Sequence, residues 1–86
     1  MSDGLAILGL APGETVRWRS ATGARWQTGT VARRERDGSI GVTDLRGLAR
    51  SFPVERLEVA CEGRRGGRRW EPLVERAARS EQMRLL

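Results

Sequence analysis

The chain of 86 residues contains no lysine, histidine, tyrosine or asparagine, and its only cysteine is Cys61. Without histidine and lysine it lacks the side chains that most often perform general acid–base catalysis at neutral pH. A single thiol cannot form an internal disulfide or a Cys-x-x-Cys metal pair, and no imidazole is available to join it. We therefore expect a protein that is not an enzyme and holds no metal or other cofactor, with Cys61 as a small buried side chain.

Long apolar runs are also missing. The longest, residues 5–12, is far short of the ~20 residues that span a bilayer, and it follows Asp3 rather than the basic segment that opens a signal peptide. No glycine-rich phosphate loop with its lysine is present. These absences predict a cytoplasmic protein with no membrane contact and no small-molecule substrate.

Aromatic residues make up only 5% of the chain. A domain of this length buries only ~60–65% of the surface that its unfolded chain exposes. Each large ring can bury roughly 150–250 Å², so the few rings are expected to account for much of the core. These rings are Trp18, Trp26, Phe52 and Trp70.

The basic residues number 16, all of them arginine, against 11 acidic residues, which gives a net charge of +5. The lack of lysine is also what a GC-rich genome would produce, so it does not by itself indicate guanidinium chemistry. The positive balance favours polyanionic partners, with nucleic acid first and acidic protein surfaces second.

Alternating apolar and polar residues predict short strands in the first two thirds of the chain. Asp37-Gly38 is the strongest hairpin signal, and Gly29 inside a predicted strand indicates a bend or a bulge. Turn signals every 8–12 residues favour a small all-β fold, which at this length is a five-stranded barrel. The strands are predicted within 14–20, 25–36, 39–45 and 48–54, with a one-turn helix and a last strand in 53–60.

Composition divides the chain into four parts. Residues 1–13 are a lead-in closed by a Pro-Gly turn, and residues 14–60 form the predicted barrel. Residues 61–70 alternate glycine with arginine and predict a flexible basic linker. Residues 71–86 predict a short helix followed by an apolar tail.

Four motifs lie in residues 14–59: Val16-x-Trp18, Trp26-x-x-Gly29-x-Val31, Asp37-Gly38-x-Ile40-x-Val42 and Arg56-Leu57-Glu58-Val59. With these motifs the segment resembles the small SH3-like barrels of the Tudor and KOW kind. The resemblance implies an SH3-like fold but leaves the ligand open, because such barrels bind methylated peptides, nucleic acid, polymerases or neighbouring proteins. A methyl-binding cage would need Trp18, Trp26 and Phe52, at least two of which we expect in the core.

Clustered arginines are the candidate nucleic-acid contacts. Such side chains bind phosphates by releasing counterions, and nothing in the sequence suggests a base reader, so contact with DNA or RNA would be largely independent of sequence. The alternative is a solvated face diluted by neighbouring acidic residues. The candidates are Arg17, Arg19, Arg33, Arg34, Arg36, Arg64, Arg65, Arg68 and Arg69.

The tail Gln82-Met83-Arg84-Leu85-Leu86 resembles the peptide by which bacterial proteins bind the β sliding clamp. The resemblance implies that Gln82 forms hydrogen bonds at the pocket rim, that Met83 packs on its wall, and that Leu85 and Leu86 fill it. Two alternatives remain: a helix packed on the barrel through Leu73, Val74, Ala77 and Leu85, or a tail without a role.

Trp70 is a further candidate partner-binding residue, since it could stack on a base, pack on a partner or hold the start of the helix. These features predict a non-enzymatic adaptor in DNA metabolism that contacts nucleic acid through arginines and a protein, with the sliding clamp as a candidate, through its tail. The alternative is a protein–protein interaction subunit with no nucleic-acid contact.

Overall fold

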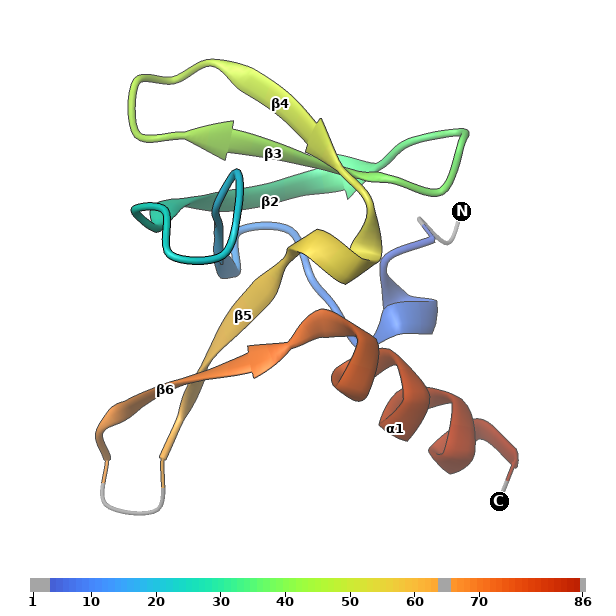
Figure 1. Ribbon diagram of the computed structural model, residues 1–86. Coiled ribbons are helices and arrows are strands. Elements are labelled where there is room, and N and C mark those ends of the chain that lie inside the picture. The colour runs from blue at the N-terminus through green and yellow to red at the C-terminus, as the bar shows by residue number, and fades with distance from the viewer. Residues whose placement is uncertain (1–3, 64–65, 86) are drawn as a thin grey trace.

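The computed structural model describes residues 4–63 and 66–85. Six antiparallel strands form one sheet in the order β4-β3-β2-β1-β5-β6, and a helix follows the last strand (Figure 1). The prediction of a mainly β fold with a short C-terminal helix is therefore confirmed. The elements are η1 (Ala6–Leu8), β1 (Thr15–Trp18), β2 (Gln27–Arg34), β3 (Ile40–Asp44), β4 (Ala49–Phe52), η2 (Val54–Arg56), β5 (Glu58–Glu62), β6 (Arg68–Pro72) and α1 (Leu73–Leu85).

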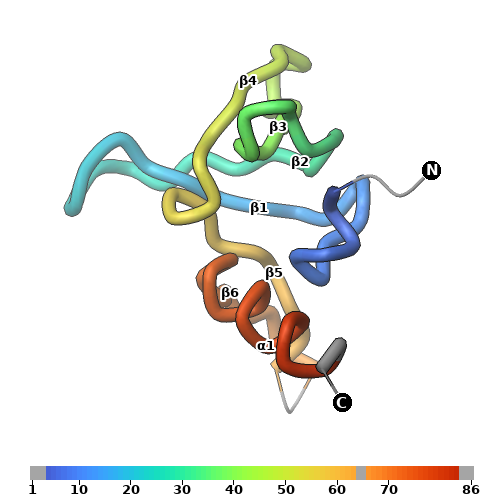
Figure 2. Tube along the Cα trace, turned by 90° about the vertical axis from the view of Figure 1, so that its right-hand side faces the viewer, coloured from blue at the N-terminus to red at the C-terminus, as the bar shows by residue number. Residues whose placement is uncertain are grey.

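The five-stranded closed barrel is not what the structure shows. Within the described residues, β4 and β6 are the two edges of an open sheet and do not pair with each other. The sheet is strongly twisted, so β2, β3 and β4 lie across the molecule from β5 and β6 (Figures 1 and 2). The sixth strand occupies the outer edge of β5, and its backbone satisfies the polar groups that this edge would otherwise leave unpaired.

A hairpin replaces most of the predicted linker. β5 continues to Glu62 and β6 begins at Arg68, with Cys61 opposite Arg69 in the register. The glycines build the turn: Gly66 adopts a φ of 78°, and the Gly63 N–H donates to the Gly67 carbonyl. Glycine is favoured in such a turn because it adopts positive φ without strain. Arg64 and Arg65 lie outside the described residues.

Two of the expected core rings lie elsewhere. Trp18 is 2% exposed and packs on the partly buried ring of Phe52, with the ring centroids 4.7 Å apart. Trp26 and Trp70 are only half-buried, so the expectation that they fill the core is wrong. Aliphatic side chains take their place. The buried core consists of Leu5, Leu8, Leu10, Val16, Trp18, Val31, Ile40, Val42, Leu57, Val59 and Leu73.

The first residues of the chain are part of this core rather than a lead-in to it. Leu5, Leu8 and Leu10 are all less than 8% exposed, and η1 lies against α1 (Figure 2). From α1, Leu73 is fully buried and Ala77 packs against the core, whereas Val74 is 43% exposed. The alternative in which the helix packs on the rest of the chain is therefore confirmed for Leu73 and Ala77 and wrong for Val74.

A buried carboxylate fixes α1 at its first turns. Glu71 is 6% exposed and accepts hydrogen bonds from Arg76, at 3.1 Å from Nε, and from Arg79. Arg76 also donates to Glu14 Oε1 at 2.7 Å, which ties the helix to the segment before β1. The hydrogen bond from Arg79, with that from Arg76, lowers the pKa of Glu71 although burial opposes this.

Gly29 has a packing role rather than the predicted bulge. The register of β2 and β3 shifts between Val31 and Arg33, two residues beyond Gly29. A Cβ at Gly29 would lie 2.9 Å from the Trp18 ring and would collide with the Thr43 carbonyl oxygen. Gly29 therefore occupies a position where the Trp18 ring and the backbone of β3 approach β2 closely.

Candidate nucleic-acid interface

The outer face of the sheet, opposite the core, carries the candidate site. Alternation along β1 sends Val16 and Trp18 into the core and Arg17 outward. In the register Arg17 lies opposite Thr28 of β2 on one side and Glu58 of β5 on the other. Side chains from neighbouring strands therefore meet around Arg17.

Two tryptophans stack against the arginines of this face. The Arg17 guanidinium carbon lies 4.0 Å from the Trp26 ring centroid and 4.6 Å from that of Trp70. The guanidinium carbon of Arg19 lies 4.3 Å from the Trp26 centroid. Alternation along β6 places Arg68 on the same face as Trp70. We call Arg19, Trp26, Arg17, Trp70 and Arg68 the arginine–tryptophan row.

Arg17 organises the row rather than offering free charge. Its Nε and Nη2 donate to Glu58 Oε1 at 2.8 and 2.6 Å, and its side chain is only 23% exposed. The ion pair holds the guanidinium plane in place, and each cation–π contact adds about 0.5–1 kcal/mol at an exposed site. Both rings are half-buried, so part of each faces solvent.

Positive charge at the two ends of the row is not neutralised. Arg19 and Arg68 form no ion pair with any described carboxylate. Arg56 donates from Nη2 to the Arg19 carbonyl at 2.8 Å, so a third guanidinium lies at the Arg19 end. Next to Trp26, between the loop after β1 and η2, is a groove of about 520 Å³ that Arg19 and Arg56 border.

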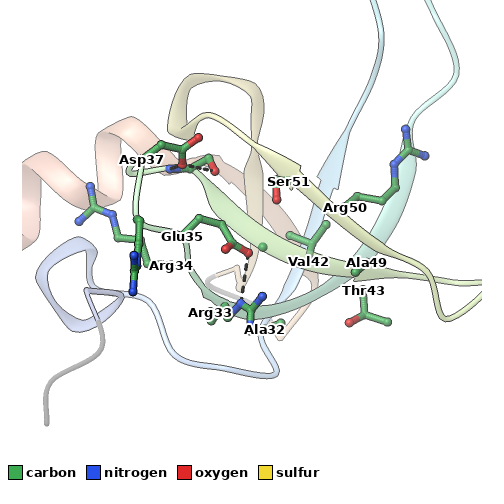
Figure 3. A pocket seen from close by; sticks show the side chains of 13 residues that line it. Ala32, Arg33, Arg34, Glu35, Asp37, Val42, Thr43, Ala49, Arg50 and Ser51 are labelled. Carbon is green, nitrogen blue, oxygen red and sulfur yellow. Dashed lines mark hydrogen bonds and ion pairs between the residues drawn. The ribbon is translucent and has the colours of Figure 1, made fainter.

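The predicted group Arg33, Arg34 and Arg36 does not form a free cationic patch. These residues line a wide, open depression on β2, β3 and β4, where Arg33 Nε pairs with Glu35 at 3.2 Å (Figure 3). Arg34 donates to the carbonyls of Gly38 and Gly4, a structural role. Of these three arginines, only Arg36 is exposed and makes no such contact with a described residue.

The other residues predicted to contact a partner lie outside the arginine–tryptophan row. Arg69 is exposed, but alternation along β6 turns it away from Trp70. Gln82 and Met83 lie in α1 and are exposed, with Met83 at 72%. The side chain of Leu85 and all of Leu86 lie outside the described residues.

Three other site types find no support in the described residues. Trp18 and Phe52 pack in the core while Trp26 lies on the outer face, so these rings do not converge into a cage. Residues 4–63 and 66–85 hold no group of three or more His, Cys, Asp or Glu that could bind a metal. No helix in the same residues is long and apolar enough to cross a membrane.

Sequence reasoning missed Glu58 and Trp26 as parts of the site. The only available signal was their alternation with core residues, because the pairing of Arg17 with Glu58 across 41 positions depends on strand register.

Comparison of the chain with protein-family models, curated proteins and solved structures finds no match. The functional argument therefore depends on the arginine–tryptophan row itself.

Proposed function

We propose that this chain is a non-enzymatic module that binds single-stranded nucleic acid on the outer face of its sheet, as an accessory factor in DNA metabolism. The observation that carries the proposal is the arginine–tryptophan row: two part-exposed indole rings held by Arg17, with an arginine at each end that forms no ion pair within residues 4–63 and 66–85. Proteins that bind single strands without sequence preference combine stacking rings with a cationic track.

Each component of the row has a physical task in this proposal. The exposed parts of Trp26 and Trp70 stack on bases, which contributes about 1–3 kcal/mol per base. Arg19, Arg56 and Arg68 contact phosphates. Bases within a duplex are already stacked and paired, so the rings favour unpaired nucleotides.

The finer fold assignment belongs to the same proposal. The first four strands follow one another through hairpins, and η2 joins β4 to β5, which pairs with β1. This order supports kinship with small SH3-like barrels of the Tudor and KOW kind, to which β6 and α1 are additions.

The test is a fluorescence anisotropy titration of labelled single-stranded and duplex oligonucleotides at several salt concentrations. We expect tighter single-strand binding, with log affinity falling against log salt by about 0.7 per neutralised phosphate. The double variant Arg19→Ser, Arg68→Ser should reduce that slope by about 1.4. The control Arg36→Ser, Arg46→Ser removes the same charge elsewhere and should leave most of the slope. Equal losses in both variants would contradict the role of the row.

Replacing Trp70 with leucine tests stacking separately from charge. Trp70→Leu keeps an apolar side chain on β6 but removes the large ring, so affinity should fall about 5- to 150-fold while the salt slope stays the same. The expected readout in the wild-type protein is quenching of indole fluorescence on binding. An unchanged affinity in Trp70→Leu would contradict base stacking at this position.

A protein contact at the end of α1 is the second candidate function. Met83 is the most exposed large apolar side chain described in the helix, at 72%, and Gln82 beside it is also exposed. This supports the sliding-clamp hypothesis for residues 82–86, although a pocket-binding peptide would require the last helical turn to unwind. A clamp titration of the full chain should show binding that is lost on removal of residues 82–86 and kept in Val74→Ser. Equal affinity of the full and shortened chains would contradict the tether, and would favour an interaction subunit that uses another surface.

A further inference from the structure

The turn between β3 and β4 exposes two leucines. Leu45 is 84% exposed and Leu48 is 59% exposed, so neither contributes much to the core. They stand three residues apart at the tip of a hairpin. Apolar side chains exposed as a pair, with charged residues around them, are typical of an interaction surface.

The turn that carries these leucines is preorganised. The carboxylate of Asp44 accepts hydrogen bonds from the backbone N–H groups of Arg46 and Leu48, at 2.9 and 3.0 Å. Backbone bonds join Asp44 N–H to the Leu48 carbonyl and Gly47 N–H to the Asp44 carbonyl, both at 2.9 Å. Gly47 supplies the positive φ of 82° that closes the turn. Binding there would therefore require little ordering of the backbone.

The leucines border a groove with a positive rim. A cavity of about 660 Å³ lies between this turn and the end of the loop before β2, with Trp26 and Thr28 also lining it. Arg25, Arg46 and Arg50 line the same cavity, and none of them forms an ion pair with a described carboxylate. Arg50 instead donates to the neutral Gln27 Oε1 at 3.5 Å. Asp44 is the acidic residue among the lining side chains, and its carboxylate is engaged by the turn.

We propose that this groove is a docking site for an acidic peptide segment of a protein partner, with apolar side chains that pack on Leu45 and Leu48 and carboxylates that meet Arg25, Arg46 and Arg50. The charge of the rim selects an acidic segment, and the leucine pair selects one with apolar anchors rather than a phosphate backbone. This surface adds a protein partner to the proposed nucleic-acid module and does not depend on that proposal.

The test uses a labelled glutamate-rich peptide with two leucines, a matched peptide in which serines replace the leucines, and a single-stranded oligonucleotide. In ¹⁵N–¹H spectra of the full chain, the leucine peptide should shift the amides of Leu45 to Leu48 and the Trp26 indole. Leu45→Ser, Leu48→Ser should weaken peptide binding at least tenfold. The control Val74→Ser changes an exposed apolar side chain elsewhere and should not.

Separate readouts distinguish this proposal from the nucleic-acid proposal. The leucine double variant should leave oligonucleotide affinity unchanged, and Arg19→Ser, Arg68→Ser should leave peptide affinity unchanged. Because both leucines are exposed, the double variant should retain the wild-type melting curve. The proposal is overturned if the leucine peptide in large excess shifts none of these amides, if the serine peptide binds equally well, or if the oligonucleotide alone shifts the turn.

Discussion

Arg17 shows how one side chain can organise a surface. It forms an ion pair with Glu58 and cation–π contacts with Trp26 and Trp70, so it links three strands and the loop before β2. A lysine would lack the planar fork that allows stacking and two donors at the same time. The residue is therefore both a structural brace and a determinant of where the rings lie.

Replacing Arg17 with leucine should destabilise the protein by about 1–3 kcal/mol, because Glu58 would lose its charged partner and two cation–π contacts would vanish. Urea unfolding followed by circular dichroism measures the change. The matched variant Arg46→Leu, at an exposed turn position with no described ion pair, should stay within about 0.5 kcal/mol of the wild type. Equal stability of the two variants would contradict the stabilising role of Arg17.

A substitution at Gly29 tests how tightly the core is packed, because it adds a single methyl group there. Gly29→Ala would place a methyl group against the Trp18 ring and the Thr43 carbonyl, so we expect a loss of about 1–3 kcal/mol. Gly67→Ala is the control, because a Cβ there would meet nothing within 4 Å. Thermal melts of both variants give the comparison, and a Gly29→Ala melt that matches Gly67→Ala would show that Trp18 can move aside.

The element with the least obvious sequence signal is β6. Arg68, Trp70 and Pro72 alternate with Arg69 and Glu71, which is a strand pattern, but the neighbouring glycines and arginines indicated a linker. The strand forms because β5 presents an unpaired edge and because Glu71 and Leu73 reach the core side. Neither reason is visible without the tertiary arrangement.

The docking of α1 should depend on pH through Glu71. Its pKa is lowered in the folded state by the hydrogen bonds from Arg79 and Arg76, so the folded protein binds this proton less tightly than the unfolded chain. The resulting stability is complete above the ordinary value of 4.5 and is lost as the pH falls through the lower folded value. Urea unfolding between neutral pH and pH 3 should show this loss.

Glu71→Gln isolates that contribution. At pH 7 it should destabilise the chain by about 2–3 kcal/mol, less than for a fully buried pair because Arg79 is 57% exposed. The difference from the wild type should shrink as the pH falls below 4.5. Glu62→Gln on the exposed end of β5 is the control and should change stability little at any pH. A difference for Glu71→Gln that stays constant with pH would contradict the role of its ionisation.

For the molecule as a whole, residues 14–60 should not fold alone. The core that covers the sheet includes Leu5, Leu8 and Leu10 from before this segment and Leu73 from after it. A chain shorter than about 50 residues that loses such side chains buries too little apolar surface to offset its conformational entropy. A peptide of residues 14–60 should give a poorly dispersed ¹⁵N–¹H spectrum, whereas the full chain should be dispersed. A dispersed spectrum of the fragment would show that residues 14–60 fold on their own, contrary to this prediction.

The two proposed binding surfaces use different parts of the sheet. The arginine–tryptophan row extends from the loop before β2 over β1 to β6, and the groove bordered by Leu45 and Leu48 lies at the β3–β4 turn, with Trp26 belonging to both. A peptide that covers the Trp26 ring would therefore compete with a base that stacks on the same ring.

The strands in the middle of the chain were predictable from local pattern, since Val16 and Trp18, Asp37-Gly38, and Ile40 and Val42 carry period-two and turn signals that need no distant partner. The same holds for the absence of histidine and lysine and for the excess of arginine. Register, however, joins residues far apart in the chain, and only the tertiary structure brought Arg17 to Glu58, Trp26 and Trp70. It also placed Leu5, Leu8 and Leu10 in the core and left Leu45 and Leu48 outside, because burial depends on which surfaces meet and not on the hydrophobicity of a side chain.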